Sequence, residues 1–200
     1  MNPLYLGTQE RRLFAVYEPA AVKDRTARAA VLCNPWGAEY VYAHRSMRQL
    51  AVKLSARGFH TLRFDYFGTG DSGGEEDEAD PAAAVADIET AAEGLQDMLG
   101  VARVALIGLR LGATLAARAA MRRKDNVDAL VLWDPIIPPE EAAGMTRSLP
   151  ARTLMLLTGT DAVLPGVTAE SISAPIPWVE DATITGAVPV RVIQRITEWL

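Results

Sequence analysis

Short apolar runs alternate with amphipathic stretches along most of this sequence, and this alternation restricts the fold more than any other feature. Runs of four or five mostly apolar residues occupy positions 29–33, 61–64, 104–107, 129–133 and 153–157. Continuous apolar runs of this length are typical of strands that are buried on both faces. Strands that alternate with helices form a mostly parallel sheet with right-handed crossovers. The sequence therefore predicts an α/β fold with helices on both faces of the sheet.

The stretches between these runs carry apolar residues at helical spacing. Met47, Leu50 and Leu54 are spaced in this way, and Gly58 ends that helix. We expect helices over 44–56, 81–95, 112–121 and 190–200, and a short helical insertion over 139–149 that would form a minimal cap. The apolar segments 4–6 and 13–17 flank a polar turn and predict an N-terminal antiparallel hairpin, and a last strand is expected near 176–179.

Length, charge and cysteine content exclude several classes of protein. Two hundred residues is the size of one ordinary domain, so we expect a single domain over 1–200. The net charge of -5 argues against nucleic acid as a partner. One cysteine cannot form an internal disulfide, and no apolar stretch has the length of a signal peptide or a membrane span. We therefore expect a cytoplasmic chain without a membrane partner.

Ligands of parallel sheets bind outside the carboxyl ends of the strands, so the residues found there are the candidates for function. They are Cys33, Asn34, Trp36, Asp65, Arg110, Asp134 and Asp161, with His44 at the start of the first crossover helix.

The segment 104–113, VALIGLRLGA, has the form of a strand, a sharp turn and a helix. Gly108 and Gly112 would let neighbouring segments approach this turn closely. The segment resembles the nucleophile elbow of α/β-hydrolases, G-x-S-x-G, except that Arg110 stands where the serine would be.

Three more segments extend this resemblance over essentially the whole chain. GFHTLRFDYFGTGDS (58–72) resembles the fourth-strand signature, LCNPWG (32–37) the loop that supplies an oxyanion amide, and TGTD (158–161) the loop that carries the triad acid. The chain is similar to serine aminopeptidase-like and esterase-like α/β-hydrolases, and its GLRLGA stretch to bacterial hydrolase-like proteins associated with exosortase systems. The resemblance implies the α/β-hydrolase fold.

That resemblance also implies a serine, an acid and a histidine in this order along the chain, and two of the three are missing. Arg110 cannot serve as the nucleophile because its guanidinium stays protonated. The only histidines, His44 and His60, precede the elbow, and 180–189, where the histidine would be expected, contains none. The sequence therefore predicts a degenerate elbow and no serine-triad hydrolysis.

Three interpretations of Arg110 stay open. At the start of a helix a cation is poorly placed and needs a carboxylate, which Asp134 or Asp161 could supply. Arg110 would then fill the old pocket through an internal salt bridge. Alternatively, Arg110 and the helix amides would hold a carboxylate or phosphate in a crevice lined by Asn34 and Trp36. The third interpretation is a rebuilt catalytic site.

A rebuilt site could use Cys33 as a thiolate paired with His44, with Asp161 as a further candidate. A lone cysteine in a buried strand is more often a small hydrophobic residue. No spacing typical of a metal site or a phosphate-binding loop is present, so we expect neither metal nor cofactor. The prediction is a non-catalytic α/β-hydrolase-fold protein that binds a small anionic molecule or a protein partner, with a homo-oligomer also open.

Overall fold

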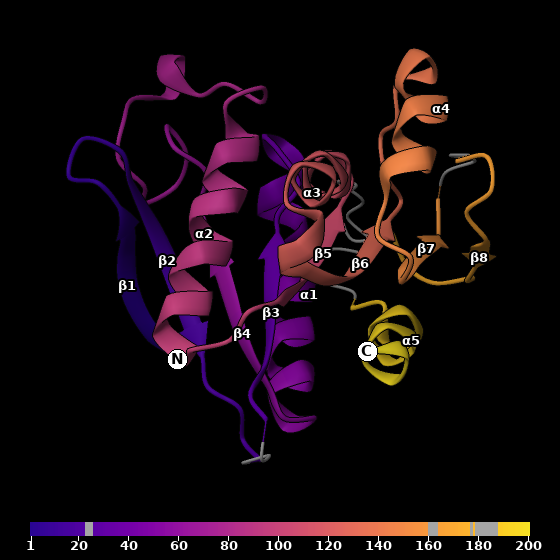
Figure 1. Cartoon of the computed structure of the whole chain (residues 1–200), viewed down its shortest axis with the longest axis horizontal. Coiled ribbons are helices and arrows are strands. Elements are labelled where there is room, and N and C mark those ends of the chain that lie inside the picture. Colours follow the sequence, from indigo (N-terminus) through magenta and orange to yellow (C-terminus); the bar gives the residue numbers. More distant parts are fainter. Residues whose placement is uncertain (23–25, 160–163, 177, 179–187) are drawn as a thin grey trace.

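A mostly parallel sheet forms the centre of the computed structural model, which describes residues 1–22, 26–159, 164–176, 178 and 188–200. The strand order within these residues is β1-β2-β4-β3-β5-β6-β7-β8 (Figure 1). The strands are β1 Asn2–Gly7, β2 Arg12–Glu18, β3 Arg28–Cys33, β4 Phe59–Phe64, β5 Val104–Leu109, β6 Val127–Trp133, β7 Thr153–Leu157 and β8 Ala169–Ser171. β1 pairs antiparallel with β2, and β2 with β4, whereas the strands from β4 to β8 are parallel. The predicted α/β-hydrolase fold with its N-terminal hairpin is confirmed.

Helices cover both faces of the sheet, which explains why the central strands are apolar without alternation. The helices are α1 Ala38–Ala56, α2 Ala84–Leu99, α3 Leu111–Arg122, α4 Pro139–Ser148 and α5 Val190–Trp199, with short 3-10 turns at Glu76–Glu78 and Lys124–Asn126. α1 and α5 pack on one face, against Ala30 and Leu32 of β3. α2 and α3 pack on the other face, against Val31 and Cys33 of the same strand.

Two elements differ from the prediction. α1 begins at Ala38, six residues before the expected start at His44, because Gly37 adopts a positive φ of 60° that lets the chain turn directly into the helix. The last strand was expected near 176–179, but β8 is a three-residue strand that pairs with β7. β8 is largely solvent-exposed, so it carries no apolar run that the sequence could show. Residues 177 and 179 lie outside the described residues.

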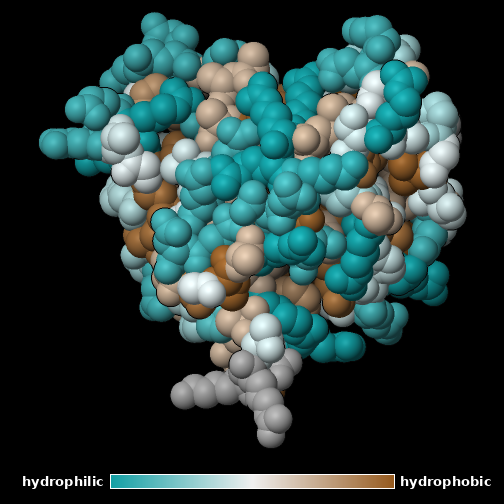
Figure 2. Space-filling model, viewed as in Figure 1, coloured by the Kyte–Doolittle hydropathy of each residue, from teal (hydrophilic) through white to brown (hydrophobic). Residues whose placement is uncertain are grey.

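The register of the central strands brings their carboxyl ends to the same level. Cys33 pairs with Gly108, and Leu109 with Trp133. The loop after β4 and the helix α4 extend beyond this edge, and α4 stands out as a separate lobe on the surface (Figure 2). No helix in the described part of the chain has the length and apolarity needed to cross a bilayer.

Candidate functional site

The predicted elbow is present between β5 and α3. Arg110 joins the two elements with φ 57° and ψ -125°, a conformation that residues other than glycine rarely adopt. A β-carbon on Gly108 would overlap the backbone of Ala113, and one on Gly112 would overlap the carbonyl oxygens of Cys33 and Asn34. Both glycines are therefore required by the close approach of β3, β5 and α3.

Among the described residues, three groups hold the Arg110 side chain, which is 16% exposed. Its Nε donates to Oε1 of Glu39 at 3.1 Å, and one terminal nitrogen donates to the carbonyl oxygen of Asp134 at 3.3 Å. Its guanidinium carbon lies 5.2 Å from the ring centroid of Trp178. Within the described residues the carboxylate partner is thus Glu39, in the first turn of α1. Of the two partners that the sequence suggested, Asp134 offers its backbone carbonyl instead.

Asp134 uses its carboxylate elsewhere, although it ends β6 as predicted. The carboxylate accepts the backbone N–H groups of Thr158 at 2.8 Å and Gly159 at 3.2 Å, as well as the Thr158 hydroxyl. Asp134 is fully buried and has a positive φ of 43°. A buried carboxylate needs hydrogen-bond donors, and the amides after β7 supply them. These contacts therefore hold the chain after β7 against the end of β6. Asp161 lies outside the described residues.

Glu39 and Trp178 are contacts of Arg110 that sequence reasoning missed. The sequence pattern places the start of this helix at His44, which leaves Glu39 outside it. An acidic residue two positions after a glycine fits the first turn of a helix, and this signal could have identified it. Nothing in the sequence connects Trp178 with Arg110.

The structure does not bring Cys33 and His44 together. The Cys33 side chain is fully buried on the face of the sheet that α2 and α3 cover, and this burial raises the pKa of its thiol. His44 is exposed on α1, which covers the opposite face, and its ring lies 6.0 Å from that of Tyr40. A nucleophilic thiolate needs a lowered pKa and access to a base, and Cys33 has neither in this arrangement.

Asn34 and Trp36 follow β3 and have different roles. The Asn34 amide donates to the carbonyl of Phe64 at 2.9 Å, and the Asn34 carbonyl accepts the Tyr66 hydroxyl at 3.0 Å. Asn34 therefore joins the ends of β3 and β4. Trp36 is half-buried, and its ring lies 5.3 Å from that of Tyr66.

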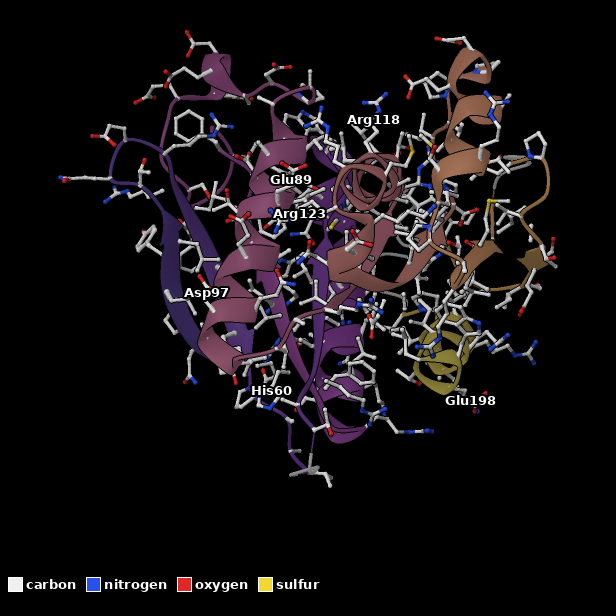
Figure 3. The ribbon with its side chains drawn as sticks, in the orientation of Figure 1. His60, Glu89, Asp97, Arg118, Arg123 and Glu198 are labelled. Carbon is white, nitrogen blue, oxygen red and sulfur yellow. The ribbon has the colours of Figure 1, made fainter. Side chains whose placement is uncertain are left out.

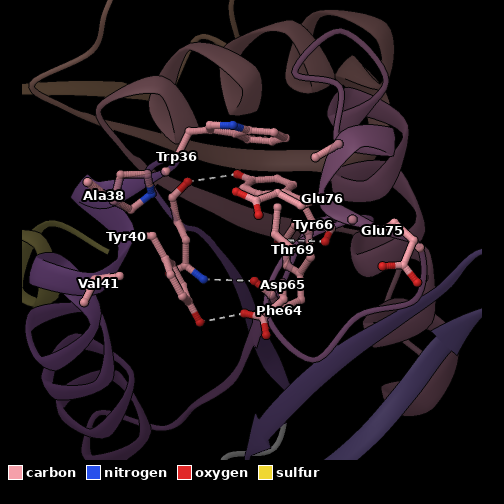
Figure 4. Close-up of a pocket in the computed structure, with 17 residues that line it drawn as sticks. Trp36, Ala38, Tyr40, Val41, Phe64, Asp65, Tyr66, Thr69, Glu75 and Glu76 are labelled. Carbon is pink, nitrogen blue, oxygen red and sulfur yellow. Dashed lines mark hydrogen bonds between the residues drawn. The ribbon is translucent and has the colours of Figure 1, made fainter.

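A pocket of about 680 Å³ lies beside the elbow, between the start of α1 and the loop after β4 (Figure 4). Trp36 and Tyr40 line it from the first segment, whereas Asp65, Tyr66 and Glu75 line it from the second. Arg110 is not among its lining residues.

Asp65, one of the strand-end candidates, holds the loop after β4 together. It accepts the Tyr40 hydroxyl at 2.7 Å and the backbone N–H of Asp71 at 3.0 Å. The loop 68–73, GTGDSG, formally matches the dinucleotide-binding pattern G-x-G-x-x-G. No α-helix follows this loop until α2 begins at Ala84, so the match has no helix N-terminus to support it.

His60 lies at the edge of the sheet opposite to the elbow, at the start of β4 (Figure 3). Its Nδ1 is 2.5 Å from the Tyr17 hydroxyl, and the two rings are stacked. These contacts give His60 a structural role at the sheet edge.

Comparison with protein families gives a match over most of the chain. Residues 26–185 match the family model described as serine aminopeptidase, S33. Uncharacterized proteins from two strains of Mycobacterium tuberculosis are 36% identical to this chain over 132 residues. The match covers 64% of this chain but only 43% of those relatives, so the shared part is less than half of their length.

Solved structures show the same fold at low identity. An alpha-beta serine hydrolase homologue from Coxiella burnetii superposes with a TM-score of 0.77 at 18% identity, covering 100% of this chain and 97% of that one. A predicted CIB-like hydrolase from Thermoplasma acidophilum gives 0.73 at 18% identity, with 99% and 96% covered. A serine hydrolase without lid from Xanthomonas campestris gives 0.71 at 16% identity, with 99% and 92% covered.

Proposed function

This chain belongs to the serine aminopeptidase S33 family of α/β hydrolases, and from that premise we propose that it binds a ligand without serine-triad hydrolysis. The observation that carries the proposal is Arg110 at the elbow turn, paired with Glu39 at 3.1 Å. A guanidinium can neither attack a carbonyl carbon nor accept a proton from a nucleophile.

The Arg110–Glu39 pair joins the start of α3 to the first turn of α1. In the α/β-hydrolase fold, the amide after the elbow residue and an amide from the loop after β3 hold the oxyanion. An arginine side chain bound across these two helix starts occupies the approach to those amides. We therefore assign Arg110 the role of an internal plug, with Glu39 compensating a cation that the helix dipole disfavours.

An anionic ligand at Arg110 would have to displace Glu39 or add a second negative charge beside it. For this reason we propose that a small molecule binds in the neighbouring pocket and not at Arg110. This pocket lies at the same edge of the sheet, and Trp36, which was expected to contact the ligand, lines it.

Two assays test the loss of hydrolysis. The wild-type protein should not be labelled by a fluorophosphonate probe, and it should hydrolyse p-nitrophenyl acetate no faster than buffer. Cys33→Ala and His44→Ala should behave as the wild type does. Stoichiometric fluorophosphonate labelling, or a turnover that Cys33→Ala or His44→Ala abolishes, would overturn the proposal in favour of a rebuilt catalytic site.

A further inference from the structure

We propose that the pocket beside the elbow binds a small organic cation, an ammonium group with apolar substituents. This inference rests on the binding function proposed above and gives its ligand a chemical class. It departs from the sequence-based expectation of an anion.

Aromatic side chains contribute to the pocket wall, namely Trp36, Tyr40, Phe64 and Tyr66. Figure 4 shows Trp36, Tyr40 and Tyr66 around the cavity, with Glu75 on the side opposite to Tyr40. The rings of Trp36 and Tyr66 lie 5.3 Å apart at an interplanar angle of 32°. The face of an aromatic ring carries negative potential, and tryptophan attracts cations most strongly among these side chains.

The charged groups of the wall are all acidic. Asp65, Glu75 and Glu76 line the pocket, and the described lining residues include no lysine, arginine or histidine. Within the described chain, none of these three carboxylates has a cationic side chain at ion-pair distance. Arg63 interacts electrostatically with Asp65 but does not line the pocket. An anion would therefore be repelled here, whereas a cation would be attracted.

Hydrogen bonds hold part of the pocket wall in place. The Tyr66 hydroxyl donates to Asn34, the Asn34 amide donates to Phe64, and the Tyr40 hydroxyl donates to Asp65. Burial and the neighbouring Asp65 raise the pKa of Tyr40, so its phenol remains a donor. Side chains that are already ordered lose little entropy on binding, which favours a small ligand.

One end of the pocket is formed by the start of α1 at Gly37 and Ala38. The positive end of a helix dipole disfavours a cation nearby. We therefore expect the ammonium group to lie toward Glu75 and Glu76, with its substituents against Trp36.

Isothermal titration calorimetry with choline and with its neutral isostere 3,3-dimethyl-1-butanol tests the proposal. We expect saturable binding of choline, at least about tenfold weaker binding of the isostere, and no binding of benzoate. Equal affinities for choline and the isostere, tighter binding of benzoate, or no binding of choline would each overturn the proposal.

Variants locate the site. Trp36→Leu and the double variant Glu75→Gln/Glu76→Gln should each weaken choline binding about tenfold. Asp77→Asn is the matched control, because Asp77 belongs to the same exposed acidic run but does not line the pocket, and it should bind choline as the wild type does. An unchanged affinity in both pocket variants would overturn the assignment, as would an equal loss in Asp77→Asn.

The two proposals can fail separately. If choline does not bind and the protein does not hydrolyse esters, only the cation-binding inference fails. Ester hydrolysis with choline binding intact would remove only the non-catalytic function.

Discussion

Gly37 and Arg110 begin two helices at the same edge of the sheet with nearly the same backbone conformation. The φ and ψ angles are 60° and -137° at Gly37, and 57° and -125° at Arg110. Around Gly37 a β-carbon would find no atom within 4 Å, and the adjacent start of α1 lines a pocket. Arg110 instead extends a side chain that Glu39 and Trp178 hold.

The difference shows that the side chain, more than the backbone, determines whether such a turn leaves space for a ligand. The elbow has the strained turn that is typical of a nucleophile elbow, and Arg110 extends a guanidinium from it. The turn at Gly37 has the same shape without a side chain, and space remains beside it. Four measurements test this contrast, beginning with the one for which we expect the largest effect.

Gly112→Ala should destabilise the protein by about 3 kcal/mol, because the new methyl group would overlap the carbonyl oxygens of Cys33 and Asn34. Urea unfolding at an unchanged m-value measures the loss. The control is Gly144→Ala in α4, where a β-carbon meets nothing within 4 Å. That variant should gain about 0.5 kcal/mol through helix propensity. A loss below about 1 kcal/mol at Gly112 would show that the elbow is not tightly packed.

The Arg110–Glu39 pair should show a coupling energy of about 1.5 kcal/mol in a double-mutant cycle with alanine, because both side chains are largely buried. The Arg118–Glu141 pair between α3 and α4 is the matched control, since it is bidentate but more exposed. Its coupling should stay below about 1 kcal/mol. Equal coupling energies would indicate that Arg110 is no more than a surface ion pair.

Cys33 lies between the two turns and should make stability depend on pH. Burial raises the pKa of its thiol in the folded protein, whereas the unfolded thiol titrates near pH 8.5, at about its ordinary value. Above that pH the unfolded state releases a proton that the folded state keeps, so stability falls as pH rises.

Between pH 7.5 and pH 9.5, the free energy of unfolding should therefore fall by about 1.4 kcal/mol more in the wild type than in Cys33→Ala. Denaturant unfolding of both proteins at the two pH values measures this difference. The same pH dependence in both would mean that the thiol ionises in the folded protein, as a Cys33–His44 pair would require.

Arg110→Gly should be more stable than Arg110→Ala by about 1 kcal/mol, because both lose the contacts with Glu39 but only glycine adopts the positive φ without strain. Gly37→Ala should cost a similar amount, about 1 kcal/mol, for the same reason. Thermal unfolding of the three variants measures both effects. If Arg110→Ala were as stable as Arg110→Gly, the elbow would have relaxed to another conformation.

Patterns that depend on burial could be predicted from the sequence, and contacts between distant segments could not. The limits of β7, 153–157, could be predicted because a strand that is covered on both faces is a continuous apolar run. The elbow could also be predicted, because a turn this tight requires glycine at positions 108 and 112. The partner of Arg110 could not, because Glu39 and Asp134 are both acidic residues at the correct edge, and only packing selects between them.

The outermost strands of the sheet also restrict how copies of this chain can associate. β8 has only three residues, and β1 carries Pro3, which lacks the N–H that an incoming strand would need. Neither of these two outermost strands in the described part of the chain offers a long, uninterrupted ladder for pairing with another chain. Growth of a continuous intermolecular sheet, the usual first step toward fibrils, is therefore disfavoured at both ends.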